Sequence, residues 1–345
     1  MKRLLYTFAV LMLGLMCSCS KDNVPEENSS IIRLMPIMDK DDVLTRASLF
    51  QNDDNLKSVS LHTYAYLAGT TTRYFDSYAH YSTADVDYTK HRWLFYSQMS
   101  GGSISYQNYY WPLTGSLDFF AYAPVDNGFV TVQETNPPKF TATMPLTNDH
   151  SGLDQEDMME FIYAYSPDKD KSTGAVPLDF KHPFAAIIFK VEKSHRDLTV
   201  NTITIDGVKY VGTCSISRET PNVPSWSLDG SKGRMDLTIG KIIPGDVNFG
   251  GDLCPPYLVI PQTNSGANTK TVTIEFHWEG AADTNWHPVT GKANTYTVSG
   301  PISNDWSAGK IYTYSLDLGD SREEILFEVS VSDWDFVYDH VFEIE

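Results

Sequence analysis

The strongest constraint on the fold is a succession of short alternating segments separated by turn residues. Between Val59 and Leu67, apolar side chains alternate with other types, the period-two pattern of a β-strand. Shorter segments bounded by Gly, Pro, Asn or Asp also favour strands. They lie at Arg92–Tyr96, Tyr106–Trp111, Leu117–Tyr122, Phe129–Val132, Lys139–Met144, Phe161–Tyr165, Met235–Ile239, Tyr257–Pro261, Thr271–Trp278, Thr295–Ser299, Ile311–Leu318, Ile325–Val331 and Val341–Ile344. No helix-period run of useful length follows Ala47, so we predict an all-β chain of sandwiches or barrels.

The chain length favours two sandwiches rather than one. With 345 residues, a sizeable core is expected in each half. The long apolar block Val176–Val191 predicts a crossover between domains, so we divide the chain into domains 47–190 and 191–345. Asp206-Gly207 between β-branched segments predicts a hairpin of Leu198–Ile205 with Val208–Ile216. Three segments are expected outside strands: Ser48–Leu56 and Pro221–Gly233 as loops, and Asn148–Glu160 as a stretch with one helical turn.

The N-terminus has the pattern of a secretory leader. Lys2 and Arg3 precede the apolar run Leu4–Met16, which is too short to span a bilayer as a helix. Ser18 stands directly before Cys19, and a small residue before a cysteine resembles the lipobox of bacterial lipoproteins. We therefore expect a signal peptide at 1–18 and a lipid on Cys19; the alternative is a plain cleaved leader with incidental cysteines.

Charge and cysteine content narrow the function classes. The formal net charge is −18, which argues against binding to nucleic acid or to an anionic membrane, because both need a basic face. The cysteines beyond the leader, Cys214 and Cys254, either form one disulfide in an oxidising compartment or are two buried thiols.

An isolated strand is predicted between the leader and the first domain. Ile32, Leu34 and Ile37 lie in a short apolar run that packs one face, and a charged loop containing Arg46 follows. Pro36 removes one backbone donor from this strand, which we expect to weaken its pairing.

Catalytic and metal motifs are weak in this sequence. A calcium loop at Asp168, Asp170 and Ser172 is disfavoured because Gly174 comes one place late for an EF-hand. A glycosidase pair among the acidic residues of 154–160 is less favoured than a solvated loop, and His182 is interpreted as structural. No hydrolase, P-loop or dinucleotide motif is present. The aromatic residues Tyr106, Tyr109, Tyr110 and Trp111 could stack on sugars, but core packing is favoured.

Five local patterns occur in a characteristic order along the chain. They are Trp111-Pro112 with Leu117–Pro124, Asp157–Met159 with Tyr163-Ala164, Leu178–His182 with Ala185–Ile187, Tyr257–Gln262, and Trp306–Tyr312 with Val331–Trp334. Together with the lipobox and Thr45-Arg46-Ala47, this order resembles the fimbrillin superfamily of the Bacteroidetes, the type V pilins.

The resemblance implies two transthyretin-like Greek-key β-sandwich domains in tandem, preceded by the signal peptide and a propeptide at 19–46. It implies export as a lipoprotein to the outer membrane and cleavage between Arg46 and Ala47 by a trypsin-like, Arg-specific protease. The strand with Ile32, Leu34 and Ile37 would then leave, and a strand of a neighbouring fimbrial subunit would replace it; Val341, Phe342 and Ile344 are the candidate donor residues.

The expected function is that of a structural subunit of a cell-surface fimbrium that serves adhesion to a host receptor. No catalytic residue, metal or cofactor is expected. The alternative is a fimbrial tip adhesin or a surface lipoprotein that binds a host glycan or protein. A tip subunit accepts a strand without donating one, so the two functions differ in the role of the C-terminal tail.

Overall fold

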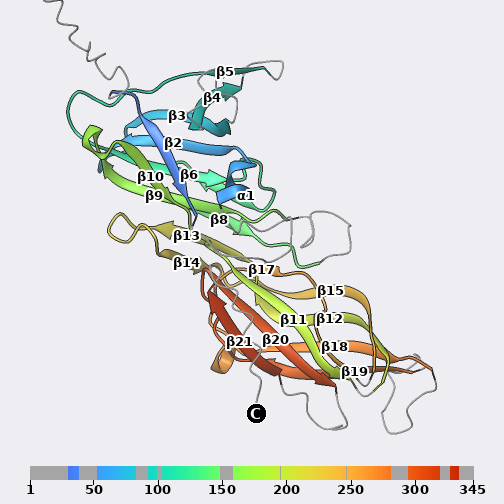
Figure 1. The fold of residues 1–345 in the computed structure, drawn as a ribbon. Coiled ribbons are helices and arrows are strands. Elements are labelled where there is room, and N and C mark those ends of the chain that lie inside the picture. The colour runs from blue at the N-terminus through green and yellow to red at the C-terminus, as the bar shows by residue number, and fades with distance from the viewer. Residues whose placement is uncertain are drawn as a thin grey trace, which may run out of the picture.

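The computed structural model describes residues 30–38, 53–82, 92–98, 103–147, 158–194, 196–245, 247–280, 294–318 and 327–333, and the account below concerns these (Figure 1). They form an all-β protein, as predicted. The short helix α1 (Asp53–Lys57) lies in a segment that we expected to be a loop. Two single 3-10 turns, Lys171–Thr173 and Gly266–Asn268, are also present. No helix among the described residues is long and apolar enough to cross a membrane.

A six-stranded antiparallel sheet forms the centre of the N-terminal half. Its strand order is β5-β4-β3-β2-β6-β9. The bounds are β2 Leu61–Leu67, β3 Arg73–Ser82, β4 Arg92–Gln98, β5 Ile104–Tyr106, β6 Leu117–Ala123 and β9 Ile162–Lys169. Strand β6 is buried along its whole length, which shows that both faces of the sheet are covered there.

A four-stranded antiparallel sheet covers one of these faces. Its order is β14-β13-β8-β7, with β7 Val130–Gln133, β8 Lys139–Thr143, β13 Val211–Ile216 and β14 Pro224–Leu228. An aromatic cluster that includes Tyr64, Phe120 and Phe140 fills the space between the two sheets. The opposite face of the six-stranded sheet is covered by a parallel pair, β1 (Arg33–Ile37) and β10 (Ala175–Asp179).

The C-terminal half is a second sandwich of two sheets. One sheet has the order β16-β11-β20-β21, with β17 also paired to β11, and the other has the order β15-β12-β18-β19. The first contains β11 Ala185–Ser194, β16 Val247–Asp252, β17 Tyr257–Val259, β20 Lys310–Leu318 and β21 Phe327–Asp333. The second contains β12 Leu198–Lys209, β15 Lys232–Ile243, β18 Lys270–Trp278 and β19 Thr295–Ile302. The cluster between them includes Phe189, Ile203 and Trp278.

Strand β11 connects the two halves. Successive side chains of a strand point to opposite faces, and in β11 Ile187 and Phe189 join the second core while Ala186 and Ile188 join the first. After residue 190 the chain also returns to the first sandwich, because β13 pairs with β8. The division at residue 190 stays a prediction, and these contacts show that the two cores share elements on both sides of it.

Two local predictions were wrong. The hairpin at Asp206-Gly207 does not form: β12 continues to Lys209, and β13 pairs with β8 and β14 instead. Gly207 has a φ of +82° at a register shift against β15, so the Asp-Gly pair accommodates a β-bulge rather than a turn. The segment Pro221–Gly233, expected to be a loop, contains strand β14. This strand lies at the edge of its sheet, and its side chains alternate between half-buried and exposed.

Candidate functional site

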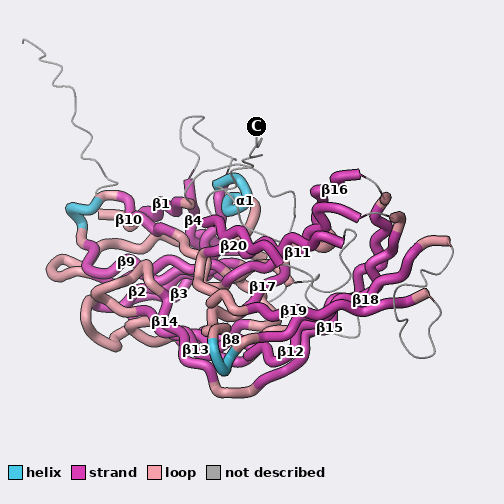
Figure 2. The backbone as a smooth tube through the Cα atoms, turned by 90° about the horizontal axis from the view of Figure 1, so that it is seen from below, coloured by secondary structure: helices cyan, strands magenta, loops and turns pink. Residues whose placement is uncertain are grey.

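The first strand lies between two segments from distant parts of the chain. Strand β1 pairs in parallel with β10, from Arg33 opposite Ala175 to Ile37 opposite Asp179. At its beginning, the Ile32 N–H donates to the Tyr109 carbonyl at 2.8 Å and the Trp111 N–H donates to the Ser30 carbonyl at 2.8 Å. Figures 1 and 2 show β1 and β10 side by side at the edge of the N-terminal half. β1 is therefore part of a separate layer and not of the six-stranded sheet.

One side of β1 faces the core. Ile32, Leu34 and Met38 are buried and pack in a cluster that also contains Phe119, Val176 and Leu178. The prediction that Ile37 belongs to this apolar face was wrong. Ile37 is half-buried, and Met38 takes the inward position one residue later. The alternation from Ile32 through Leu34 would have indicated Met38, because inward positions recur every second residue.

Pro36 does not weaken the ladder to β10, contrary to our expectation. The Phe180 N–H donates to the Ile37 carbonyl at 2.9 Å, whereas the Ile32 N–H donates to Tyr109 on the other side. Backbone groups of successive residues alternate in direction along a strand, so the odd-numbered residues bond to β10 and Pro36 faces away from it. A proline is tolerated at such a position because no ladder donor is lost.

The burial of β1 contributes a large free energy of stabilisation for a single strand. Burying an aliphatic side chain contributes about 1.5–3 kcal/mol, so three of them contribute about 5–9 kcal/mol as an upper estimate. Whole domains are stable by only about 5–15 kcal/mol. Loss of β1 would also leave the backbone edge of β10 unpaired, so an empty groove would strongly favour an incoming strand.

Several predicted site residues lie outside the described residues. They are the lipidation candidate Cys19, the cleavage pair Arg46 and Ala47, and the candidate donor residues Val341, Phe342 and Ile344. Their roles stay predictions. The structure brings together Ile32 and Leu34 with β10 and with the segment Tyr109–Trp111, neither of which the sequence identified as a partner of the first strand.

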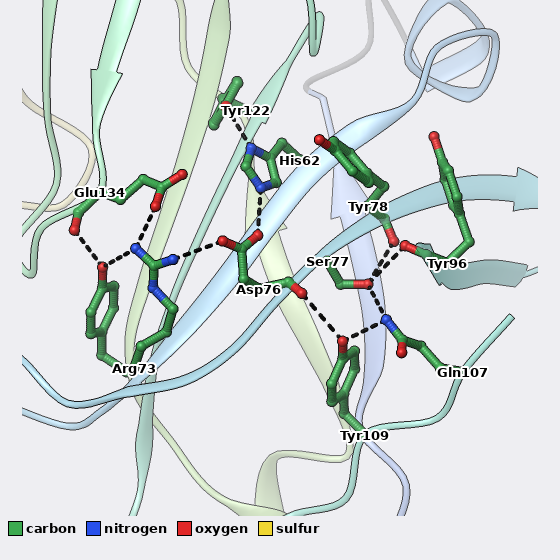
Figure 3. A network of polar contacts seen from close by, with 11 residues as sticks. His62, Arg73, Asp76, Ser77, Tyr78, Tyr96, Gln107, Tyr109, Tyr122 and Glu134 are labelled. Carbon is green, nitrogen blue, oxygen red and sulfur yellow. Dashed lines mark hydrogen bonds and ion pairs between the residues drawn. The ribbon is translucent and has the colours of Figure 1, made fainter. Parts of the chain in front are cut away.

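A polar network lies on the same six-stranded sheet, on the face opposite β1 (Figure 3). The ring nitrogens of His62 contact the Tyr122 hydroxyl at 2.5 Å and Asp76 at 2.6 Å. The Arg73 guanidinium pairs with both Asp76 and Glu134. The hydrogen bond from His62, with further help from Arg73 and against burial, holds the pKa of the Asp76 carboxyl below its usual value.

His62, Asp76 and Glu134 also have the composition of a metal site, with one ligand atom each within 4.8 Å of one another. Arg73 competes with any cation for this position, because its guanidinium already donates to both carboxylates. We therefore interpret the cluster as an ion-pair network that attaches β3 to the segment after β7.

A cleft of about 590 Å³ lies where the two halves meet. Trp226 of β14 lines it from the first sandwich, and Gln262, Asp305 and Trp306 line it from the second. Both indole N–H groups are engaged within the protein, since Trp226 donates to the Pro183 carbonyl and Trp306 donates to the Tyr314 hydroxyl, each at 2.8 Å. Trp306 is only 2% exposed, so of these two indoles it is mainly the half-buried Trp226 that presents ring surface to the cleft.

The other sequence candidates have structural partners. His182 contacts the buried Glu160 at 2.5 Å. Asp168 pairs with Arg218, and Asp170 accepts from the Ser172 N–H at a 3-10 turn. Residues 154–157 of the acidic segment lie outside the described residues.

Cys214 and Cys254 are both buried, form no disulfide and lie in different core clusters. Burial raises the pKa of the Cys214 thiol, which keeps it protonated and unreactive.

Core packing was favoured for four aromatic residues, and the structure confirms it for two of them. Trp111 is buried, and Tyr109 stacks on the buried Phe75 with ring centroids 4.1 Å apart. Tyr106 and Tyr110 are instead exposed, by 55% and 53%.

Comparison with known proteins points to one family. A family model described as fimbrillin-like matches residues 45–334. A comparison with curated proteins returns no match.

Solved structures also resemble the chain. A cell adhesion protein of Bacteroides uniformis, described as putative, is 16% identical, with 88% of this chain and 99% of that chain covered and a TM-score of 0.51. A fimbrial protein of Bacteroides vulgatus is 14% identical, with 88% and 99% covered and a TM-score of 0.48. The C-terminally truncated tip fimbrial protein Mfa3 of Porphyromonas gingivalis is 11% identical, with 80% and 94% covered and a TM-score of 0.36.

Proposed function

Because the chain belongs to the fimbrillin-like family, whose model matches residues 45–334, we propose that it is a structural subunit of cell-surface fimbriae that polymerises by exchange of its first strand. A fimbrial subunit is a structural protein, and no catalytic step is part of this proposal. Its partners are other fimbrial subunits and, through adhesion, a host receptor.

The observation that carries the proposal is the position of β1. It covers one face of the six-stranded sheet in a two-stranded layer with β10, so its departure removes no strand from that sheet. The vacated groove would present the unpaired edge of β10 and the apolar side chains of Phe119, Val176 and Leu178. An incoming strand satisfies such an edge with main-chain hydrogen bonds, and its alternate side chains fill the apolar positions.

The proposed maturation has three steps. The precursor is exported and receives a lipid on Cys19, which anchors it to the outer membrane. An Arg-specific, trypsin-like protease then cuts between Arg46 and Ala47. The released strand leaves, and Val341, Phe342 and Ile344 of a neighbouring subunit enter the groove. Until the cut, β1 prevents premature polymerisation because it occupies the acceptor site.

N-terminal sequencing of the surface-assembled protein tests this proposal. The expected mature N-terminus is Ala47, and the variant Arg46→Ala is expected to remain uncut and monomeric. Lys40→Ala is the matched control, since it removes a basic residue from the same segment and should leave processing unchanged. An assembled protein that retains an acylated Cys19 would contradict the proposal and would indicate an anchor subunit or a monomeric lipoprotein.

A further inference from the structure

A row of aromatic residues crosses the six-stranded sheet on the face opposite β1. Its members stand directly opposite one another on adjacent strands: Tyr122 on β6, His62 on β2, Tyr78 on β3, Tyr96 on β4 and Tyr106 on β5. Residues directly opposite in an antiparallel ladder share a face. These side chains therefore form one continuous strip, and Figure 3 shows His62, Tyr78 and Tyr96 projecting from the same side of the sheet.

The rings of this row contact each other in sequence. His62 lies 5.1 Å from Tyr122 and stacks on Tyr78 at 4.8 Å, and Tyr78 lies 5.5 Å from Tyr96, measured between ring centroids. His80 extends the strip, with its ring 5.2 Å from Tyr96 and 5.5 Å from Tyr106. Such mutual packing holds each ring in one orientation, so the strip is organised before any ligand binds.

Among the described residues, the four-stranded sheet covers one end of the strip. Tyr163 of β9 stands opposite Tyr122 and is fully buried in the core between the two sheets. Toward the other edge, Tyr78 and His80 are half-buried and Tyr106 is 55% exposed. The accessible surface therefore runs from Tyr106 across His80 to Tyr78, over a layer formed by the packed rings of Tyr96 and His62.

Polar groups border the inner end of this surface. Asp76 and Glu134 lie beside His62, each with more than a third of its side chain exposed, and Arg73 pairs with both. Partly exposed aromatic rings beside carboxylate, imidazole and hydroxyl groups fit a pyranose sugar, which has an apolar C–H face and a rim of hydroxyl groups. The accessible surface from Tyr106 to Tyr78 spans two strand spacings, about 10 Å, which suits an oligosaccharide of two or more units better than a single sugar.

Charge decides which class of sugar fits. The two carboxylates exceed the single guanidinium, and the whole chain carries a formal net charge of −18. An anionic sugar would be repelled by both the local and the overall charge, whereas a neutral sugar would not. We propose that this aromatic strip, defined by Tyr106, His80, Tyr78, Tyr96 and His62, is a binding site for a neutral oligosaccharide.

This site goes beyond the proposed polymerisation and is separate from it. The β1 groove and the aromatic strip lie on opposite faces of the same sheet. Replacement of β1 by another strand therefore leaves the strip in place. A subunit could bind sugar whether or not it has been assembled into a fimbria, so the two proposals can fail independently.

The test compares the full chain with two tyrosine variants on a glycan microarray that carries neutral, sialylated and sulfated oligosaccharides at equal density. Wild type is expected to bind one or more neutral glycans, and Tyr106→Ala is expected to bind them about tenfold or more weakly, because Tyr106 is the most exposed aromatic residue of the strip. Tyr110→Ala is the matched control, because Tyr110 is equally exposed, at 53%, but lies outside the strip. Isothermal titration with the strongest neutral glycan gives the affinities.

Four results would overturn the proposal. The first is the absence of binding to any glycan by wild type. The second is binding restricted to sialylated or sulfated glycans. The third is equal binding by wild type and Tyr106→Ala. The fourth is a Tyr106-dependent dimer in sedimentation velocity without glycan binding, which would make the strip a contact between copies of the chain. Equal thermal unfolding of the three proteins verifies that the variants are folded, and assembly ladders are expected to be unchanged in Tyr106→Ala.

Discussion

At the scale of single residues, Asp118 is the point where polar contacts of the first sandwich converge. Its side chain is fully buried and accepts hydrogen bonds from the backbone N–H groups of Gly69 and Asp168 and from the Asn136 amide, at 2.8–2.9 Å. Arg218, which follows β13, donates to it at 3.1 Å. This carboxylate therefore connects the six-stranded sheet with the segment after β13, which follows strands β11 and β12 of the second sandwich in the sequence.

We predict that Asp118→Asn lowers the free energy of unfolding by about 2–3 kcal/mol, because it leaves buried donors without a charged acceptor; the partial exposure of Arg218 limits the loss. Urea unfolding measures this change. Asp236→Asn is the matched control, since Asp236 and its partner Arg234 are both more than half exposed, and a change below about 1 kcal/mol is expected there. Equal effects of the two substitutions would contradict this role of Asp118.

The same carboxylate predicts a dependence of stability on pH. Burial acts to raise the pKa of Asp118, but hydrogen bonds from Arg218, Asn136, Gly69 and Asp168 outweigh it and hold the pKa below its ordinary value. A lowered pKa contributes stability that is present above the unfolded pKa of about 3.9 and is lost as the pH falls through the folded pKa. The stability difference between wild type and Asp118→Asn should therefore be largest near neutral pH and shrink below about pH 4. A difference that grows in acid would refute this.

At the scale of elements, strand existence could be predicted from the sequence better than strand pairing. The alternation in Val59–Leu67 predicted β2, and the apolar block Val176–Val191 overlaps most of β10 and β11. The Asp206-Gly207 signal failed because a glycine with positive φ serves a bulge as well as a turn.

The two proposed sites depend on strand pairing, which local patterns do not encode. The groove requires β1 to pair with β10, and the aromatic strip requires four strands in one register. Tyr106 and Tyr78 have no relation in the sequence that would place them on one face. The first strand itself could be identified because Ile32 and Leu34 already show the inward phase.

The strength of β1 in the groove can be measured with one inward and one outward substitution. Leu34→Ala is expected to lower the free energy of unfolding of the uncut full chain by about 2–4 kcal/mol, because it leaves a cavity in the cluster below the strand. Met35→Ala, at a neighbouring position that is 45% exposed, should change it by less than about 0.5 kcal/mol. Urea unfolding gives both values, and a neutral Leu34→Ala would show that β1 is not held by its apolar face.

At the scale of the whole molecule, the two halves are joined through strands that contribute to both of them. β11 contributes to both cores, and β13 with β14 returns to the first sandwich. The candidate donor segment follows β21, at the end of the chain. A subunit with an acceptor groove in one half and a donor segment after the other half would form head-to-tail contacts, which extend into filaments.

Substitutions in the C-terminal tail test its proposed role as the donor strand. Replacing Val341, Phe342 and Ile344 together by Asp is expected to abolish SDS-resistant ladders of the assembled protein, because charged side chains cannot fill apolar positions. Glu343→Gln with Glu345→Gln is the matched control in the same segment, and its ladders should persist. Ladders that survive the triple substitution would mean that another segment is donated, or that the chain is a tip subunit.

The central claim is that a strand of another molecule replaces β1 beside β10, and cross-linking at the groove tests it most directly. A photo-reactive amino acid at position 175, which stands opposite Arg33, would report the neighbour of β10 in assembled fimbriae. The predicted result is a cross-link to residues 335–345 of a different subunit, identified by mass spectrometry with isotope-mixed chains. A cross-link to residues 30–38 of the same chain in assembled material would contradict the account.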